Sequence, residues 1–214
     1  MKRILLALGL WLSLVGSAFA QCIGVSGIGS VPVVGVTCDS EPVVATYSAA
    51  AIGLVTAASA TDIACLTGSA TKVVRIQRIR VSGTAGSIRA LPILITKHAS
   101  ANTVGTPATG TALPVPYRLV STDPAPTATT TSWTANPTIN DSTPGLIGVE
   151  IVALNLVGTP VGPVVGAIMD WETRRYSEAP TLRGIAQQVC INLNSITVDA
   201  PKISLSFTWT EAAQ

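Results

Sequence analysis

The stretch from Thr67 to Thr84 constrains the fold of this chain more than any other part of the sequence. It reads TGSATKVVRIQRIRVSGT, so it is rich in β-branched residues, has turn residues at both ends and carries four cations. β-Branched side chains pack well on a pleated surface, and Gly and Ser commonly bound strands. We therefore predict a long strand here, at the centre of the fold.

The apolar residues of this stretch do not follow a simple two-residue alternation. Two apolar pairs occur, Val74 with Ile76 and Ile79 with Val81. Because side chains alternate along a strand, a straight strand would place the two pairs on opposite faces. A β-bulge near Gln77 and Arg78 would add one residue and turn all four apolar side chains inward. The alternative is a strand that passes from one sheet of a sandwich to the other. Both interpretations predict an irregular strand.

Short strand patterns separated by Gly and Pro continue along the rest of the chain, and the clearest alternation lies at residues 202–210. Residues 48–59 are expected to form a loop or a short strand. Residues 99–140 are rich in Pro, Thr, Ser and Ala. Long structureless loops are uncommon in compact domains, so we expect edge strands around 115–120 and 129–134. The pattern predicts an all-β fold, an antiparallel β-sandwich resembling a jelly roll.

The amino terminus has the pattern of a secretory signal peptide. Lys2 and Arg3 precede an apolar run at residues 4–15, and Ala18-Phe19-Ala20 has the form that signal peptidase cleaves. An uncleaved anchor is the alternative, although the apolar run is short for a membrane span. We predict a signal peptide at residues 1–20, an exported protein, and no membrane span after cleavage.

Cleavage would leave 214 − 20 = 194 residues, which is enough for one sizeable hydrophobic core. Residues 21–42 are rich in Gly, Val and Pro and are expected to form an extended arm. Residues 43–214 are expected to form a single β-sandwich domain.

Four cysteines follow the signal peptide: Cys22, Cys38, Cys65 and Cys190. An even number in an exported chain favours disulfides, and three pairings are open. We favour Cys22 with Cys38 and Cys65 with Cys190, with buried free thiols as the alternative. The chain has no Cys-x-x-Cys motif, so no metal site and no cofactor are predicted.

The sequence offers little support for catalysis. His98 is the only histidine and Gly-x-Ser-x-Gly is absent, so we expect His98 to be a solvated surface residue. Asp170 and Glu172 flank Trp171, an arrangement reminiscent of paired glycosidase carboxylates beside a sugar-stacking ring. Two arginines follow directly, so a surface cluster of acids and bases is the preferred interpretation. We predict that the chain is not an enzyme.

The basic residues cluster although the mature chain is neutral, with 13 − 2 = 11 basic and 11 acidic residues. Arg75, Arg78 and Arg80 could form a binding face for phosphate, lipopolysaccharide or nucleic acid. Alternatively, they pair with acidic residues of neighbouring strands. No aromatic residues are interleaved with them, so ion pairing is favoured and no nucleic-acid partner is expected. Trp133 and Trp171 are candidate platforms for a cell-surface glycan.

The motif Gly68-Ser69-Ala70-Thr71-Lys72, the strand that follows it through Thr84, and the later residues 134–137 and 189–194 resemble a family found among bacteriophage and prophage genes. Members of that family are taken to be virion-associated β proteins without known enzymatic activity. The resemblance implies a β fold, no catalytic site and association with virion components.

Together, these observations predict a non-enzymatic, exported structural or surface-interaction protein. Fold analogy and the low content of charged residues, 11%, predict self-association into a homo-oligomer. The alternative function is a secreted carbohydrate- or cell-surface-binding module.

Overall fold

The computed structural model describes residues 44–87, 89–156 and 169–214. The predicted signal peptide, the extended arm and the predicted Cys22–Cys38 disulfide lie outside these residues. No helix in the described ranges is both long enough and apolar enough to cross a membrane.

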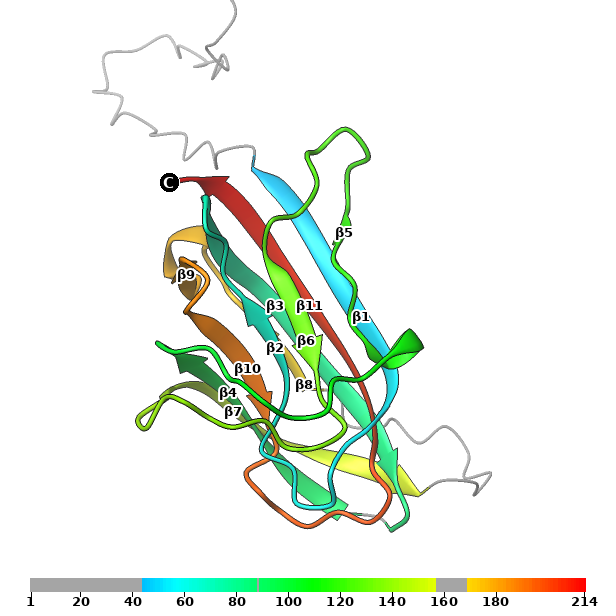
Figure 1. The fold of residues 1–214 in the computed structure, drawn as a ribbon. Coiled ribbons are helices and arrows are strands. Elements are labelled where there is room, and N and C mark those ends of the chain that lie inside the picture. Colours follow the sequence, from blue (N-terminus) through cyan, green and yellow to red (C-terminus); the bar gives the residue numbers. More distant parts are fainter. Residues whose placement is uncertain (1–43, 88, 157–168) are drawn as a thin grey trace, which may run out of the picture. The chain divides into compact units, whose positions relative to one another are not determined.

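The described residues form two β-sheets that pack face to face around one hydrophobic core (Figure 1). Sheet I contains β1 (Ala45–Val55), β3 (Lys72–Ala85), β5 (Tyr117–Arg118), β8 (Met169–Glu172), β9 (Thr181–Arg183) and β11 (Lys202–Ala213). Sheet II contains β2 (Asp62–Thr67), β4 (Arg89–His98), β6 (Thr129–Ser132), β7 (Gly145–Leu156) and β10 (Gln188–Asn192). Two short 3₁₀ turns occur at Gly110–Ala112 and Tyr176–Glu178. Neighbouring strands are antiparallel except where the ends of β3 and β7 pair in parallel and connect the sheets.

The strand order confirms the predicted jelly-roll sandwich. In sheet I, β11 lies between β1 and β3, and β8 and β9 pair with the far edge of β3. In sheet II the order is β7-β4-β10-β2. The chain thus crosses repeatedly from one sheet to the other, and the orders β1-β11-β3-β8 and β2-β10-β4-β7 are those of a jelly roll. The predicted edge strands are also present, since β5 extends sheet I beside β1 and β6 extends sheet II beside β2.

The predicted bulge in the long strand β3 is confirmed. Arg78 pairs with Thr208 of β11, but the next residue of β11, Trp209, pairs with Ile76, so Gln77 is the extra residue. All four apolar side chains consequently reach the core: Val74, Ile76, Ile79 and Val81 are at most 1% exposed.

Of the two forms expected for residues 48–59, a strand is present through Val55, but as the continuation of a long strand and not as a separate short one. Strand β1 continues to Val55 and pairs with β11 along nearly its whole length, with an irregularity between Ala51 and Leu54. Gly53 lies in this irregularity with φ of +69°, a conformation that glycine adopts without strain. Small, Ala-rich residues have little strand propensity of their own, so the pairing with β11 determines the conformation.

The carboxy-terminal strand β11 forms the centre of sheet I. Its predicted apolar face is buried, and the rings of Trp209 and Tyr47 lie 5.9 Å apart in the core. The carboxylate of Glu211 accepts hydrogen bonds from the Trp209 indole and from the backbone amides of Thr127 and Ala128. This buried acid therefore fixes the segment that leads into β6.

Candidate functional site

The predicted Cys65–Cys190 disulfide is present. The two cysteines are directly opposite each other on β2 and β10, with their Cα atoms 4.1 Å apart. Their neighbours Leu66 and Val189 belong to the main core, so the cysteine side chains point to the outer face of sheet II. Both cysteines are nevertheless fully buried, and with Trp133 they form a second hydrophobic cluster.

Segment 99–141, which contains the Pro- and Thr-rich residues 99–140, covers this disulfide through Trp133 and Asn102. Isolated bridges join Thr103 to Thr138 and Pro107 to Trp133, so the segment folds back on itself above β2 and β10. Trp133 is only 5% exposed because it packs on the disulfide. The prediction that Trp133 offers a sugar-stacking platform is therefore corrected: the face of its ring is not open to a ligand.

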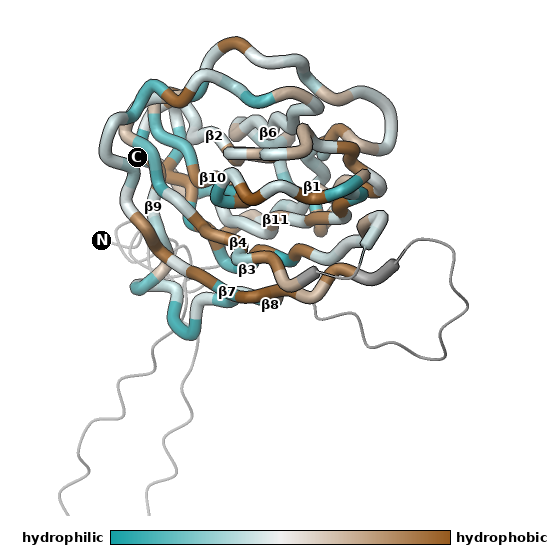
Figure 2. Tube along the Cα trace, turned by 90° about the horizontal axis from the view of Figure 1, so that it is seen from below, coloured by the Kyte–Doolittle hydropathy of each residue, from teal (hydrophilic) through white to brown (hydrophobic). Residues whose placement is uncertain are grey.

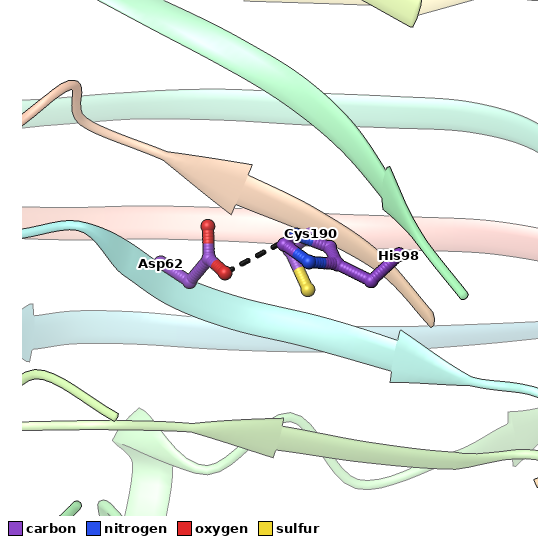
Figure 3. Close-up of side chains that lie close together, drawn as sticks. All are labelled: Asp62, His98 and Cys190. Carbon is purple, nitrogen blue, oxygen red and sulfur yellow. Dashed lines mark ion pairs between the residues drawn. The ribbon is translucent and has the colours of Figure 1, made fainter. Parts of the chain in front are cut away.

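A buried polar cluster lies beside the disulfide, and sequence reasoning did not predict it. A register shift at the Asp62–Asn192 end of the β2–β10 pairing turns Asp62 to the same side as Cys65. One Asp62 oxygen accepts a hydrogen bond from the Asn192 side chain at 2.7 Å. The other accepts one from the Asn102 side chain at 2.6 Å and lies 3.2 Å from His98 Nε2. Figure 3 shows Asp62, His98 and Cys190 converging from three strands.

The expectation that His98 is a solvated surface residue is wrong, because its side chain is fully buried. It is the last residue of β4, and segment 99–141 covers it. Its Nε2 atom lies 2.9 Å from Thr96 Oγ1 as well as near Asp62, whereas its Nδ1 atom has no hydrogen-bond partner in the described part of the chain. In a catalytic triad the hydroxyl and the carboxylate contact different ring nitrogens. Here both contact the same nitrogen in a closed interior, so the geometry does not support a hydrolytic triad.

The predicted arginine cluster lies on the outer face of sheet I, and an acid neutralises much of it. Arg78 donates two hydrogen bonds to the Asp170 carboxylate, at 2.6 and 2.5 Å, and Arg80 donates two more at 3.2 and 3.1 Å. Strand β8 brings Asp170 there by pairing with β3. Arg75 instead stacks on Tyr176, 4.9 Å from the ring centroid. This geometry favours ion pairing between strands over an open anion-binding face.

Asp170 should make a small, pH-dependent contribution to stability. Hydrogen bonds from Arg78, and then from Arg80, lower its pKa from 3.8 to about 2, against partial desolvation that raises it. A lowered folded-state pKa gives stability that is present above pH 4 and is lost as the pH falls towards 2. We expect Asp170→Asn to lower the free energy of unfolding at pH 7 by about 1 kcal/mol or less, because the pair is solvent-accessible.

Urea unfolding of both chains at several pH values measures this effect. The difference between them should shrink from pH 4 to pH 2. Glu172→Gln is the matched control, because Glu172 is on the same strand but forms no ion pair within the described ranges. A difference that stays constant down to pH 2 would contradict the assignment to this ion pair.

Trp171 lies apart from Trp133. Its side chain is half-buried, packs against the main core and lies beside Gly148 of β7, where an added Cβ atom would come within 3.1 Å of the ring. The two tryptophans therefore do not form a shared sugar-stacking surface. Of the two, only Trp171 remains a candidate for stacking on a glycan.

Comparisons of the chain with protein-family models, with curated proteins and with solved structures found no match.

Proposed function

We propose that this chain is a non-enzymatic, exported structural protein that self-associates through sheet II. The leader pattern and the buried disulfide support export, and the resemblance to virion-associated β proteins supports a structural role. The observation that carries the proposal is a set of uncovered apolar side chains on the outer face of β4 and β7.

We call this set the apolar strip. It consists of the exposed residues Leu146, Val149 and Ile151 of β7 and the half-buried residues Pro92 and Leu94 of β4. Pro92 is opposite Ile151 and Leu94 is opposite Val149 in the β4–β7 pairing, so the side chains are contiguous. Val149 and Ile151 are 60% and 67% exposed. Figure 2 shows hydrophobic residues along both strands. Contiguous exposed apolar surface on a β-sheet typically marks an interaction site.

The outer face of sheet II is thus divided into two halves. Segment 99–141 covers the β2–β10 half, where the disulfide lies, whereas nothing in the described chain covers the strip. No charged side chain belongs to the strip, so a charged partner such as a nucleic acid would gain little from binding it.

The free edge of β7 supports a second copy of this chain as the partner. From Gly145 to Leu154, β7 pairs only with β4 among the described residues, so its other edge has unpaired backbone groups. Such an edge is a template for another strand. Antiparallel pairing of β7 with β7 of a second copy is compatible with two-fold symmetry, in which the same patch meets itself. It would bring the two apolar strips together.

Light scattering coupled to gel filtration tests this interface. We expect the unsubstituted chain to form a dimer or larger oligomer, and Ile151→Glu to be monomeric at the same concentration with an unchanged circular dichroism spectrum. The substitution would remove apolar surface where the two strips meet and place a charge beside the apolar side chains of the neighbouring strand, which disfavours cross-strand pairing.

Ile52→Glu is the matched control. Ile52 is 69% exposed, about as much as Ile151, but lies on β1 of sheet I. It should leave the oligomer intact. An unsubstituted chain that stays monomeric at hundreds of micromolar, or equal effects of the two substitutions, would contradict the proposed interface.

A further inference from the structure

Four side chains with metal-binding atoms converge in the buried cluster on sheet II. The ligand atoms of Asp62, His98 and Cys190 all lie within 4.8 Å of one another. Cys65 is directly across from Cys190 and is bonded to it. With the disulfide formed, neither sulfur is a thiolate, so the cluster offers only an imidazole and a carboxylate. Reduction would add two thiolates at the same place.

We propose that the reduced chain binds one zinc ion through Cys65, Cys190, His98 and Asp62. Structural zinc is tetrahedral and prefers thiolate sulfur and imidazole nitrogen, with carboxylate oxygen also accepted. The four side chains come from three adjacent strands of one sheet, so the metal would connect β2, β10 and β4. This inference concerns the reduced chain and is independent of the proposed self-association.

The hydrogen bonding of the cluster gives independent support, because one ring nitrogen of His98 lacks a partner in the described chain. Its Nδ1 atom is buried without a partner among the described residues, although buried polar atoms nearly always have one. Its other nitrogen is shared between Thr96 and Asp62. If Nδ1 coordinates a metal and Nε2 donates a hydrogen bond to the Thr96 hydroxyl, both ring nitrogens of His98 have a partner.

Asn102 is placed to support the ligands from outside. Its side-chain nitrogen donates to Asp62 at 2.6 Å and lies 3.6 and 3.8 Å from the sulfurs of Cys65 and Cys190. An amide that donates to the carboxylate and to thiolate sulfur is typical of the second layer around a metal site. The oxygen of this amide is buried without a partner in the described chain.

Zinc binding in place of the disulfide requires a two-electron reduction followed by the loss of two protons. An external dithiol supplies two electrons and two protons to the Cys65–Cys190 bond and is itself oxidised to a disulfide. Zinc then displaces the two thiol protons, which pass to solvent. The strands β2 and β10 would thus be joined by a covalent bond in an oxidising compartment and by a metal ion in a reducing one.

Cobalt titration of the reduced protein tests the site. For this experiment, Cys22→Ser and Cys38→Ser are introduced into the full chain, so that only two thiols remain. The protein is reduced with a phosphine, and a thiol titration verifies the reduction. We expect one Co²⁺ per chain, with thiolate-to-cobalt charge-transfer absorption that disappears when Zn²⁺ is added. Asp62→Asn should weaken binding at least tenfold.

The oxidised form of the same protein is the matched control and should bind no cobalt with thiolate absorption. Thiolate absorption should also be absent after Cys65→Ser with Cys190→Ser. If the reduced chain loses its β-sheet circular dichroism without metal, one equivalent of Zn²⁺ should restore it. A reduced, folded chain that binds no cobalt, an unfolded one that zinc does not restore, or equal binding by the oxidised form would overturn the proposal.

Discussion

Deletion of Gln77 is expected to destabilise the protein by about 3–6 kcal/mol. Gln77 is the extra residue of the β3 bulge. Without it, the alternation of side chains would turn one apolar pair of β3 towards solvent, either Val74 with Ile76 or Ile79 with Val81. Each buried Val or Ile side chain contributes about 1.5–3 kcal/mol. Such a loss is a large part of the total stability of a typical domain.

Urea unfolding followed by tryptophan fluorescence measures this loss, because Trp209 lies in the core. Gln77→Ala is the matched control: it keeps the length of the strand and the backbone carbonyl that accepts from Thr173, so it should cost less than about 1 kcal/mol. A deletion no more destabilising than this substitution would show that the bulge does not determine the orientation of the apolar pairs.

Replacing both cysteines of the disulfide, Cys65→Ala with Cys190→Ala, is expected to cost about 5 kcal/mol under oxidising conditions. The two residues are 125 positions apart, and a cross-link that closes so long a loop strongly restricts the unfolded chain. The thermal midpoint should fall with the free energy of unfolding. Denaturant unfolding of both proteins measures the difference.

Repeating this comparison of the unsubstituted and the doubly substituted protein under reducing conditions with a chelator distinguishes the contribution of the disulfide to stability from that of side-chain packing. Both proteins then lack the bond and any metal, so most of the difference should vanish, leaving only the packing of two small side chains. A difference of the same size in both conditions would contradict the cross-link as its cause.

Sequence reasoning predicted the framework of the site but not its chemistry. The number of cysteines and the strand assignments favoured the pairing of Cys65 with Cys190 among three possible pairings, and it is present. Asp62 and Asn102 were missed. The available signal was a single acidic residue at the start of an otherwise apolar strand, and nothing in the sequence indicated that a loop residue would join it.

His98 and Trp133 show why prediction failed at this place. Each is flanked by polar or small residues, which is typical of a surface position, and neither has a local pattern that indicates burial. His98 lies beneath segment 99–141, whereas Trp133 belongs to this segment and packs inward on the disulfide. The Pro and Thr content of the segment resembles that of an exposed linker. Burial on the outer face of a sheet depends on where such a segment folds, and this is a long-range property.

The sequence by itself determined most of the strands, the jelly-roll class and an irregularity in β3, for which a bulge was one of two interpretations. These features follow from the two-residue period of side chains, which depends only on near neighbours along the chain. Only the tertiary structure decided that β10 lies between β2 and β4, so that Asp62, His98 and the disulfide meet. It also decided which half of sheet II stays uncovered. Contacts between residues far apart in sequence depend on how the strands pair, and no local pattern records that pairing.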